Sequence, residues 1–472
     1  PADARIIAEK VLSIDPLDFG AANELYLARQ ALGEAGAEST LAGLRFRMRD
    51  EVQAYLELAT DYLNAGLFDE AIGVLKRPVE GKMKFAGTYP LVYYYLGYLY
   101  QRQGQTEQAA AYYKQAAAMP PDYCFPFRLE TLEVLDAALA ADPNDARAYY
   151  YKGNLLYDLQ PENAMICWEK SRSLDDSLAT VHRNLGWVYS RIQNDMPKAI
   201  ACYEKAIACD GLDPRLFLEL DTLYESANAA PEKRLAALEK NHATVAQRVE
   251  SFTREIQVLV LNGKYDQAID YLANNFFHVS EGNGEIHDIY VDAHLLKGLQ
   301  EMKSGRYAEA LAHFQKASEY PENLSVGRPQ NDPRAPQVAY YTGTAYEALG
   351  DSAKAREAYQ VAADQSGSQR SPEPGFYKAL GLAQLGQNEE TAKLFGGLID
   401  RGARSLSREG GGDFFAKFGE QQTRQARQAT GHYLQGLGYL GQGEKAKAKE
   451  EFRQAVELNQ NHLWARYQLS EL

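Results

Sequence analysis

The densest group of side chains that could do chemistry lies between residues 276 and 294, in the stretch FFHVSEGNGEIHDIYVDAH. Side-chain types that bind metals, hold polar ligands or transfer protons gather there: His278, Glu281, His287, Asp288 and Asp292. Two glycines predict a loop, and the helical spacing after it places His287 near His294 and Asp288 beside Asp292. No close pair such as His-x-x-x-His is present, so we expect contacts to a ligand or another domain and no metal.

Motifs for catalysis are missing from the rest of the chain. There is no Gly-x-Ser-x-Gly, no His-Glu-x-x-His and no glycine fingerprint after a strand. The triple glycine at 410–412 lacks the lysine and hydroxyl of a phosphate loop. Acidic pairs such as Asp175 and Asp176 fall at expected turns, where carboxylates cap helices. We therefore expect no hydrolase or transferase activity from this chain alone, and no cofactor.

The elements that position these residues come from an internal repeat. In the clearest copy, Gly97 and Ala109 mark a close helix crossing, Tyr113 fills the gap beside it, and Pro121 ends the second helix. The pattern recurs about every 34 residues in roughly ten copies, the length of a helix–turn–helix tetratricopeptide unit. It predicts an all-α, TPR-like α-solenoid that forms a right-handed superhelix. Glycines are predicted at six crossings: Gly97, Gly153, Gly186, Gly298, Gly343 and Gly436.

The phase of the repeat also predicts how the chain is organised. Weaker copies are centred on Asp221, Ile256 and Gly381, and His294 falls at an aromatic packing position. Residue 1 falls in a second helix, so we expect an exposed apolar end and a longer parent protein. We divide the chain into three groups of repeats, at 1–145, 146–282 and 283–472.

Three segments depart from the repeat. The segment 120–127, PPDYCFPF, stands where a first helix is due, either as a kink that redirects the superhelix or as a docking surface for another domain. Residues 320–336 are too rich in proline and glycine for a helix and predict a long loop over the edge of the solenoid. Residues 405–422 predict a second loop with a glycine tip and a cluster of phenylalanines.

Side chains on the first helix of each repeat are expected to line the concave face. These predicted binding residues are Tyr94, Tyr98, Arg102, Arg147, Tyr150, Asn154, Arg183, Trp187 and Arg191. Tyrosine, tryptophan and arginine give large contact areas and charge-assisted hydrogen bonds, as at protein-recognition surfaces. The alternative is that the groove is filled by its own packing.

A known variant of the repeat grips a peptide carboxylate through Lys, Asn, Asn, Lys and Arg. Similar residues stand here at Asn154, Asn184 and Arg215, but Tyr150 and Glu219 occupy the other two places. A glutamate facing a carboxylate repels it. We therefore do not expect a carboxylate clamp.

The composition limits which kinds of partner the chain can bind. The net charge of -14 and the pI near 5.2 argue against nucleic acid, which is bound by a basic face. No apolar run approaches the length of a membrane span. We expect a cytoplasmic protein that binds protein partners and not membranes.

The whole chain resembles the C-terminal half of a family of large bacterial proteins. Three stretches carry the resemblance: DYCFPFRLETLEVLDAALAADPNDARAYYYKGNLLYD, FFHVSEGNGEIHDIYVDAHLLKG and EYPENLSVG. Proteins of that family carry an N-terminal β-sandwich similar to galactose mutarotases, an unassigned domain and then tetratricopeptide-like helices. The resemblance implies a carbohydrate-related role, with any sugar chemistry outside this chain.

Two hypotheses about function follow. In the first, the chain is a non-catalytic scaffold that packs on its own N-terminal domain, binds a partner or assembles a homo-oligomer. In the second, it is the helical half of a carbohydrate-active enzyme and lends residues between His278 and His294 to a sugar site. In that reading Glu281, His287 and Asp288 are the exposed members of the segment.

Overall fold

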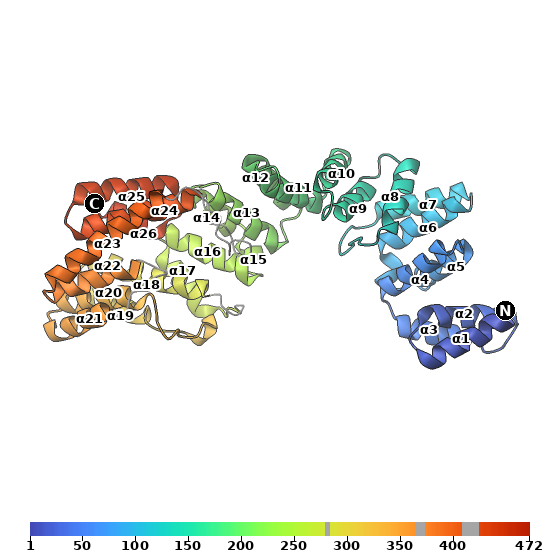
Figure 1. Ribbon diagram of the computed structural model, residues 1–472, viewed down its shortest axis with the longest axis horizontal. Coiled ribbons are helices and arrows are strands. Elements are labelled where there is room, and N and C mark those ends of the chain that lie inside the picture. The colour runs from blue at the N-terminus through green and yellow to red at the C-terminus, as the bar shows by residue number, and fades with distance from the viewer. Residues whose placement is uncertain (279–283, 365–372, 408–423) are drawn as a thin grey trace. The chain divides into compact units, whose positions relative to one another are not determined.

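The fold is all-α throughout the part of the chain that the structure describes. The computed structural model describes residues 1–278, 284–364, 373–407 and 424–472, and within these ranges there are helices and turns but no strand (Figure 1). The predicted all-α, TPR-like α-solenoid is confirmed. The chain separates into two compact units, Pro1–Asn194 and Asp195–Leu472. The predicted grouping into 1–145, 146–282 and 283–472 stays a prediction.

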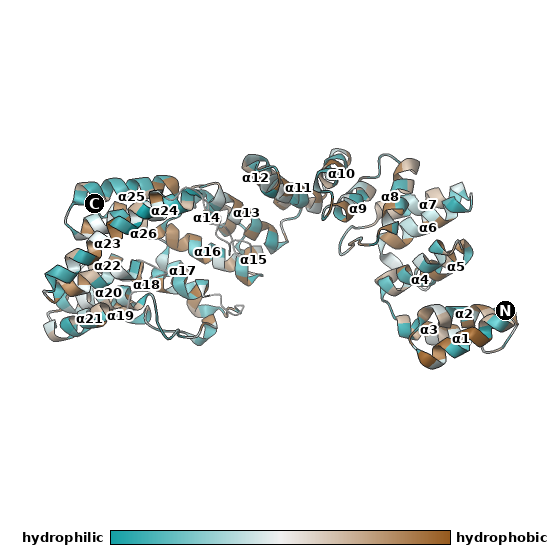
Figure 2. Cartoon of the chain, viewed as in Figure 1, coloured by the Kyte–Doolittle hydropathy of each residue, from teal (hydrophilic) through white to brown (hydrophobic). Residues whose placement is uncertain are grey.

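Unit 1 consists of successive antiparallel helix pairs, interrupted before α8. Its α-helices are α1 (Ala2–Ile14), α2 (Phe19–Ala31), α3 (Ala37–Met48), α4 (Val52–Asn64), α5 (Phe68–Glu80), α6 (Pro90–Arg102), α7 (Thr106–Ala118), α8 (Glu130–Ala141), α9 (Ala146–Leu156), α10 (Pro161–Leu174) and α11 (Ala179–Arg191). A 3-10 turn, η1 (Ala86–Thr88), precedes α6. Apolar and polar residues alternate along most of these helices (Figure 2), as expected where each helix buries one face.

Unit 2 continues the helical pairs with more variation in helix length. Its described elements are α12 (Met196–Cys209), α13 (Pro214–Ser226), α14 (Pro231–Glu239), α15 (His242–Val245), α16 (Val249–Leu261), α17 (Tyr265–Asn274), α18 (Glu285–Lys303), α19 (Tyr307–Lys316), the 3-10 turn η2 (Glu322–Leu324), α20 (Ala335–Ala348), α21 (Ser352–Asp364), α22 (Glu373–Gln384), α23 (Asn388–Ser407), α24 (Arg424–Gly441), α25 (Lys445–Leu458) and α26 (Leu463–Ser470). Most of the predicted 405–422 loop lies outside the described residues.

Helix pairs cross where a glycine meets an aromatic ring. A Cβ atom placed on Gly97 would lie 2.5 Å from the ring of Tyr113, and one on Gly343 would lie 2.5 Å from the ring of Tyr359. The same contact joins Gly153 to Trp168, Gly298 to Phe314 and Gly436 to Phe452. Gly186 is buried as well. The crossings predicted from the repeat are therefore present, and they exclude any larger side chain.

In one copy of the repeat, a buried ion pair takes the place of the contact between a glycine and an aromatic ring. Asp221 occupies the place of the crossing glycine on α13, and the guanidinium of Arg234 from α14 is fully buried against it, with two hydrogen bonds of 2.7 Å. Arg254 from α16 joins Asp221 to Glu225, with distances of 2.7 and 2.6 Å. Two arginines thus balance two carboxylates, as buried charge requires.

Unit 2 also closes on itself. The turn after α13 meets the turn after α25, since Asn228 Nδ2 donates to Glu457 O at 3.0 Å and Gln460 N donates to Asn228 Oδ1 at 2.7 Å. Trp464 Nε1 from α26 donates to Asp292 Oδ1 on α18 at 2.9 Å. The last helices of the unit therefore pack against its first ones, which explains why it forms one compact body.

The segment 120–127 contains no helix and turns at Asp122 and Tyr123, where the φ of Tyr123 is 57°. Cys124 and Pro126 are buried, while Tyr123, Phe125 and Phe127 are exposed. The missing first helix predicted here is confirmed, and the aromatic rings that replace it face outward.

Glycine crossings set the stability of each repeat. We expect Gly343→Leu to lower the free energy of unfolding by about 1–3 kcal/mol, because the new side chain must displace the Tyr359 ring. The matched control is Gly397→Leu on α23, where no atom lies within 4 Å of an added Cβ. Thermal and urea unfolding measure both variants, and equal melting temperatures for Gly343→Leu and the wild type would refute the crossing.

The buried ion network should be equally sensitive. Arg234→Leu leaves Asp221 with one fewer cationic partner in the interior, and we expect a loss of about 3–5 kcal/mol. Arg172→Leu on α10 removes a solvent-exposed partner of Glu169 and should cost less than about 1 kcal/mol. Urea titration measures the free energy of unfolding of both variants. Similar losses would show that the buried ion network stabilises the protein no more than an exposed ion pair does.

Candidate functional site

Three of the residues predicted on the concave face of unit 1 are packing residues. Tyr94, Tyr98 and Tyr150 are buried. The hydroxyl of Tyr94 donates to Asp145 Oδ2 at 2.8 Å, and the other oxygen of Asp145 caps α9 by accepting from Ala148 N. Burial raises the pKa of the Asp145 carboxyl. These three tyrosines therefore pack inside unit 1 and offer little surface to a partner, while the concave face itself stays a prediction.

The predicted arginines are partly or fully exposed but differ in their contacts. Arg102 donates to the hydroxyl of Tyr98 at 2.8 Å, and its guanidinium lies 5.1 Å from the centre of the Phe68 ring. Arg147 lies 3.8 Å from Asp175, and Arg183 is half-buried. Arg102 therefore belongs to a neighbouring part of the face, beside α5 and α6.

The predicted residues on α9 and α11 come together. Asn184 Nδ2 donates to Asn154 Oδ1 at 2.9 Å, and Trp168 Nε1 donates to the same oxygen at 3.1 Å. The side chain of Asn154 is thus held from both sides. Its own amide group and the carbonyl oxygen of Asn184 have no hydrogen-bond partner among the described residues, and both side chains are half-buried.

An aromatic and cationic surface continues from this pair along α11. Trp187 is 37% exposed, and its Nε1 donates to the hydroxyl of Tyr157 at 2.7 Å. The guanidinium of Arg191 lies 4.8 Å from the centre of the Trp187 ring. We call Asn154, Tyr157, Asn184, Trp187 and Arg191 the asparagine–tryptophan face. Tyr157 and Asn184 were absent from the predicted binding set, although Asn184 was visible in the clamp-like spacing.

The polar groups of this face have the chemistry that peptide binding requires. A free amide donor beside a free amide acceptor matches the donor and acceptor of a peptide group. Trp187 offers an exposed ring, and Arg191 adds a cation beside it. No nucleophile and base are paired at this place, so the arrangement supports binding.

The segment that leads into α18 is more deeply buried in unit 2 than its sequence suggested. His287 is only 5% exposed, its Nε2 lies 3.0 Å from Glu319 O, and its ring stacks on Tyr320 at 3.8 Å between centres. The prediction that His287 is exposed is therefore wrong, because the 320–336 loop folds over it. That loop is anchored in turn by Asn323, whose side chain donates to two backbone carbonyls at 2.7 Å.

The other predicted residues of the segment have different surroundings. Asp292 is held by Arg334 and Trp464, and Asp288 lies 3.7 Å from Arg334. His278 is exposed, and Glu281 lies outside the described residues. The predicted core position of His294 is confirmed by its burial, and burial lowers its pKa to about 3.

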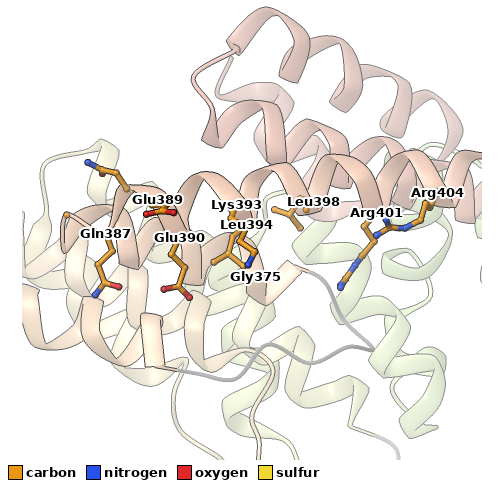
Figure 3. Close-up of a pocket in the computed structure, with 12 residues that line it drawn as sticks. Gly375, Gln387, Glu389, Glu390, Lys393, Leu394, Leu398, Arg401 and Arg404 are labelled. Atoms are coloured by element: carbon orange, nitrogen blue, oxygen red, sulfur yellow. The ribbon is translucent and has the colours of Figure 1, made fainter.

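Two features of unit 2 were missed by sequence reasoning. The carboxylate of Glu255 is fully buried on an apolar helix, 2.9 Å from His242 Nδ1, and burial raises its pKa. A hollow of about 1100 Å³ follows α23 (Figure 3), with Glu389 and Glu390 near the start of the helix and Arg401 and Arg404 toward its end. Glu389 and Glu390 in the first turn of α23 and Arg404 in its last turn complement the helix dipole.

Metal and membrane features are absent from the described residues. In those ranges no group of three or more His, Cys, Asp and Glu side chains is arranged to hold a metal ion. None of the described helices is both long enough and apolar enough to cross a membrane.

The burial of His287 generates a prediction. His287→Ala removes a stacked, hydrogen-bonded ring from the interior and should cost about 1–3 kcal/mol. His278→Ala changes an exposed side chain of the same type and should cost less than about 0.5 kcal/mol. Urea unfolding compares the two, and an unchanged stability of His287→Ala would restore the reading of His287 as a surface residue.

Four stretches of the chain match family models described as tetratricopeptide repeat. They cover residues 90–123, 181–215, 295–370 and 429–462. These stretches contain five of the predicted crossing glycines, at 97, 186, 298, 343 and 436.

Solved structures of repeat proteins are also similar to this chain. YrrB, a TPR protein with an unusual peptide-binding site, is 20% identical, covers 48% of this chain and 99% of its own, and has a TM-score of 0.30. A thermophilic TPR protein of Thermus thermophilus is 17% identical over 44% of this chain and 98% of its own, with a TM-score of 0.25.

The Cut9–Hcn1 structure of the APC/C is 12% identical over 99% of this chain and 92% of its own, with a TM-score of 0.27. The family models agree with the glycine–aromatic crossings seen in both units. The chain is a helical-repeat protein of the α-solenoid class that carries tetratricopeptide repeats.

Proposed function

We propose that this chain is a non-catalytic scaffold that binds an extended segment of a protein partner along the asparagine–tryptophan face of unit 1. The observation that carries the proposal is the Asn154–Asn184 pair. Its internal hydrogen bond and the Trp168 contact fix both amides while leaving one donor and one acceptor side by side. Fixed polar groups lose little entropy when they bind, which favours affinity.

The neighbouring side chains indicate what the bound segment carries. The Trp187 ring offers an apolar surface, and its indole N–H is already engaged by Tyr157. Arg191 beside that ring suits a carboxylate on the partner. We propose a peptide whose backbone meets the asparagines and whose apolar and acidic side chains meet Trp187 and Arg191.

The wider context of the scaffold rests on the resemblance of the irregular segments. We propose that the chain is the C-terminal part of a larger, carbohydrate-related, cytoplasmic bacterial protein, and that its partners include its own N-terminal domain. The gene sequence upstream of residue 1 tests this directly. A reading frame without a β-sandwich would contradict it.

The alternative places residues of the 278–294 segment at a sugar site between domains. Among the residues predicted in this segment, His278 and Asp288 are described and exposed, so they carry this alternative in place of the buried His287. It predicts that His278→Ala with Asp288→Ala weakens sugar binding or domain docking in the full-length protein. Peptide binding at the asparagine–tryptophan face would be unaffected by these two substitutions.

The peptide-binding proposal predicts a specific loss. Peptides selected from a displayed random library on the purified chain should bind Asn184→Ala about tenfold more weakly, since a bound peptide group loses its acceptor and Asn154 loses its brace. Trp187→Ala should weaken the same peptides, as expected for a hot-spot tryptophan. Titration calorimetry measures both.

The matched control is Asn163→Ala on α10, an exposed asparagine whose amide contacts only Gln160 among the described residues. It should bind the selected peptides like the wild type. If Asn184→Ala and Trp187→Ala bind as tightly as Asn163→Ala, the peptides are held elsewhere and the proposed face is wrong.

A further inference from the structure

Unit 2 contains a small hollow where its last helix packs against earlier ones. The hollow has a volume of about 120 Å³ and is walled by α16, α18 and the start of α26. We call it the closure hollow. It has room for several water molecules, and none of its residues belongs to the asparagine–tryptophan face of unit 1.

The polar part of its wall consists of hydrogen-bond acceptors. Three carboxylates and two side-chain amides line it, from Gln257, Glu285, Asp288, Asp292 and Asn461. The amide oxygens of Gln257 and Asn461 are buried and have no hydrogen-bond partner among the described residues. Asn461 is held in this orientation because its Nδ2 donates to Ala229 O at 3.2 Å. A buried acceptor without a donor costs free energy, so a ligand that brings donors would gain from both amides.

The carboxylates at this place outnumber the cation beside them. Arg334 is held by Asp292 and lies 3.7 Å from Asp288. Burial opposes the charge of this guanidinium, but Asp292, Asp288 and Glu373 together raise its pKa. One guanidinium therefore faces three carboxylates, which leaves an excess of negative charge beside the closure hollow.

The other cations on the walls pair with carboxylates outside the hollow. The pairs are Arg254 with Asp221, Lys297 with Asp266, Lys303 with Glu471, and Arg466 with Glu232. Burial lowers the pKa of His462 to about 4 and that of His294 to about 3, so both are uncharged at neutral pH. In the described part of the chain no lysine or arginine lines the closure hollow, so its charge attracts a cation.

The rest of the wall is apolar and limits which cation fits. Val260, Leu261, Ile289 and Leu463 supply this part. A metal ion such as Ca²⁺ needs about six to eight oxygen ligands at close range, and no three acidic, histidine or cysteine side chains of the described residues are arranged to hold one. An alkylammonium ion fits better, because its head donates three hydrogen bonds and its chain packs on apolar side chains.

We propose that the closure hollow binds a primary alkylammonium ion, which is either a free small amine or the side chain of a lysine on a protein partner. The ammonium head is held by Asp288 and by the amide oxygens of Gln257 and Asn461. The alkyl chain lies against Ile289 and Leu463. A ligand held in this way joins the start of α26 to α16 and α18, so it stabilises the closed form of unit 2.

The test uses n-butylammonium as the probe and 1-butanol as its neutral counterpart, with the full chain. Saturation-transfer NMR measures binding, and thermal unfolding measures stabilisation. We expect butylammonium to bind and to raise the melting temperature, and 1-butanol to bind about tenfold more weakly or not at all, since it has no charge.

Two substitutions in the wall test the acceptors separately. Asp288→Asn should weaken butylammonium binding about tenfold, because a charge-assisted hydrogen bond is lost. Gln257→Met should also weaken it, yet leave the melting temperature of the free chain unchanged or higher, because it removes a buried acceptor that has no partner. A purely structural role of Gln257 would give the opposite pattern.

Two matched controls separate the hollow from general surface effects. Asp270→Asn on α17 and Gln300→Met on α18 change exposed side chains of unit 2 outside the hollow, and both should bind butylammonium like the wild type. Absence of butylammonium binding, equal binding by all variants, or equal binding of 1-butanol overturns the proposal. So does binding of galactose in place of butylammonium, which would favour the sugar-site alternative.

A further probe, Nα-acetyl-lysine N-methylamide, distinguishes the two sources of the ammonium group. Its binding alongside butylammonium indicates a lysine side chain, whereas binding of butylammonium alone indicates a free amine, and either result supports the site. Asn184→Ala should leave amine binding intact, so failure of this proposal and failure of the peptide-binding proposal can be told apart.

Discussion

The contact between a glycine on one helix and an aromatic ring on the next sets the geometry of this protein. Where the Cβ is missing, a ring enters the space that a side chain would fill, and the two helix axes approach closely. The same contact recurs in both units, at Gly97, Gly153, Gly298, Gly343 and Gly436. Each repeat is therefore fixed locally, and the side chains on its other faces are free to vary.

The side chains on the first helices of the repeats in unit 1 show this variation. Tyr94 and Tyr150 were predicted to line a groove but are buried as packing residues, whereas Asn154, Asn184 and Trp187 stay partly exposed on the same kind of helix. The repeat fixes where a side chain lies on its helix. The side chains packed around it determine whether it is exposed enough to contact a partner. Tyr94 is removed from the surface by Asp145, which caps the following repeat.

This division explains how far the sequence could predict the molecule. The helix crossings follow from local spacing, so Gly343 could be identified as a crossing glycine without coordinates, while its partner ring, Tyr359, was identified in the structure. The buried state of His287 could not, because it depends on Tyr320 and Glu319 in a loop whose path has no periodicity. The Asp221–Arg234 pair was visible only as a weak copy, since charge had replaced the small residue that marks a crossing. The missing first helix at 120–127 was visible in the sequence, but the outward direction of its rings required the structure.

The closure of unit 2 changes what kind of folding behaviour a repeat protein can have. An open array of repeats interacts only with its nearest neighbours, so its ends can fray independently and its middle can fold without them. In unit 2, Gln460 donates two hydrogen bonds to Asn228 across more than half of the unit's sequence, and Trp464 Nε1 donates to Asp292 on α18. A chain with such contacts has no true terminal repeat. The turn after α13 and the last helices lose or keep these contacts together, so we expect the unit to unfold more cooperatively than an open array and to fold through the slower search that long-range contacts impose.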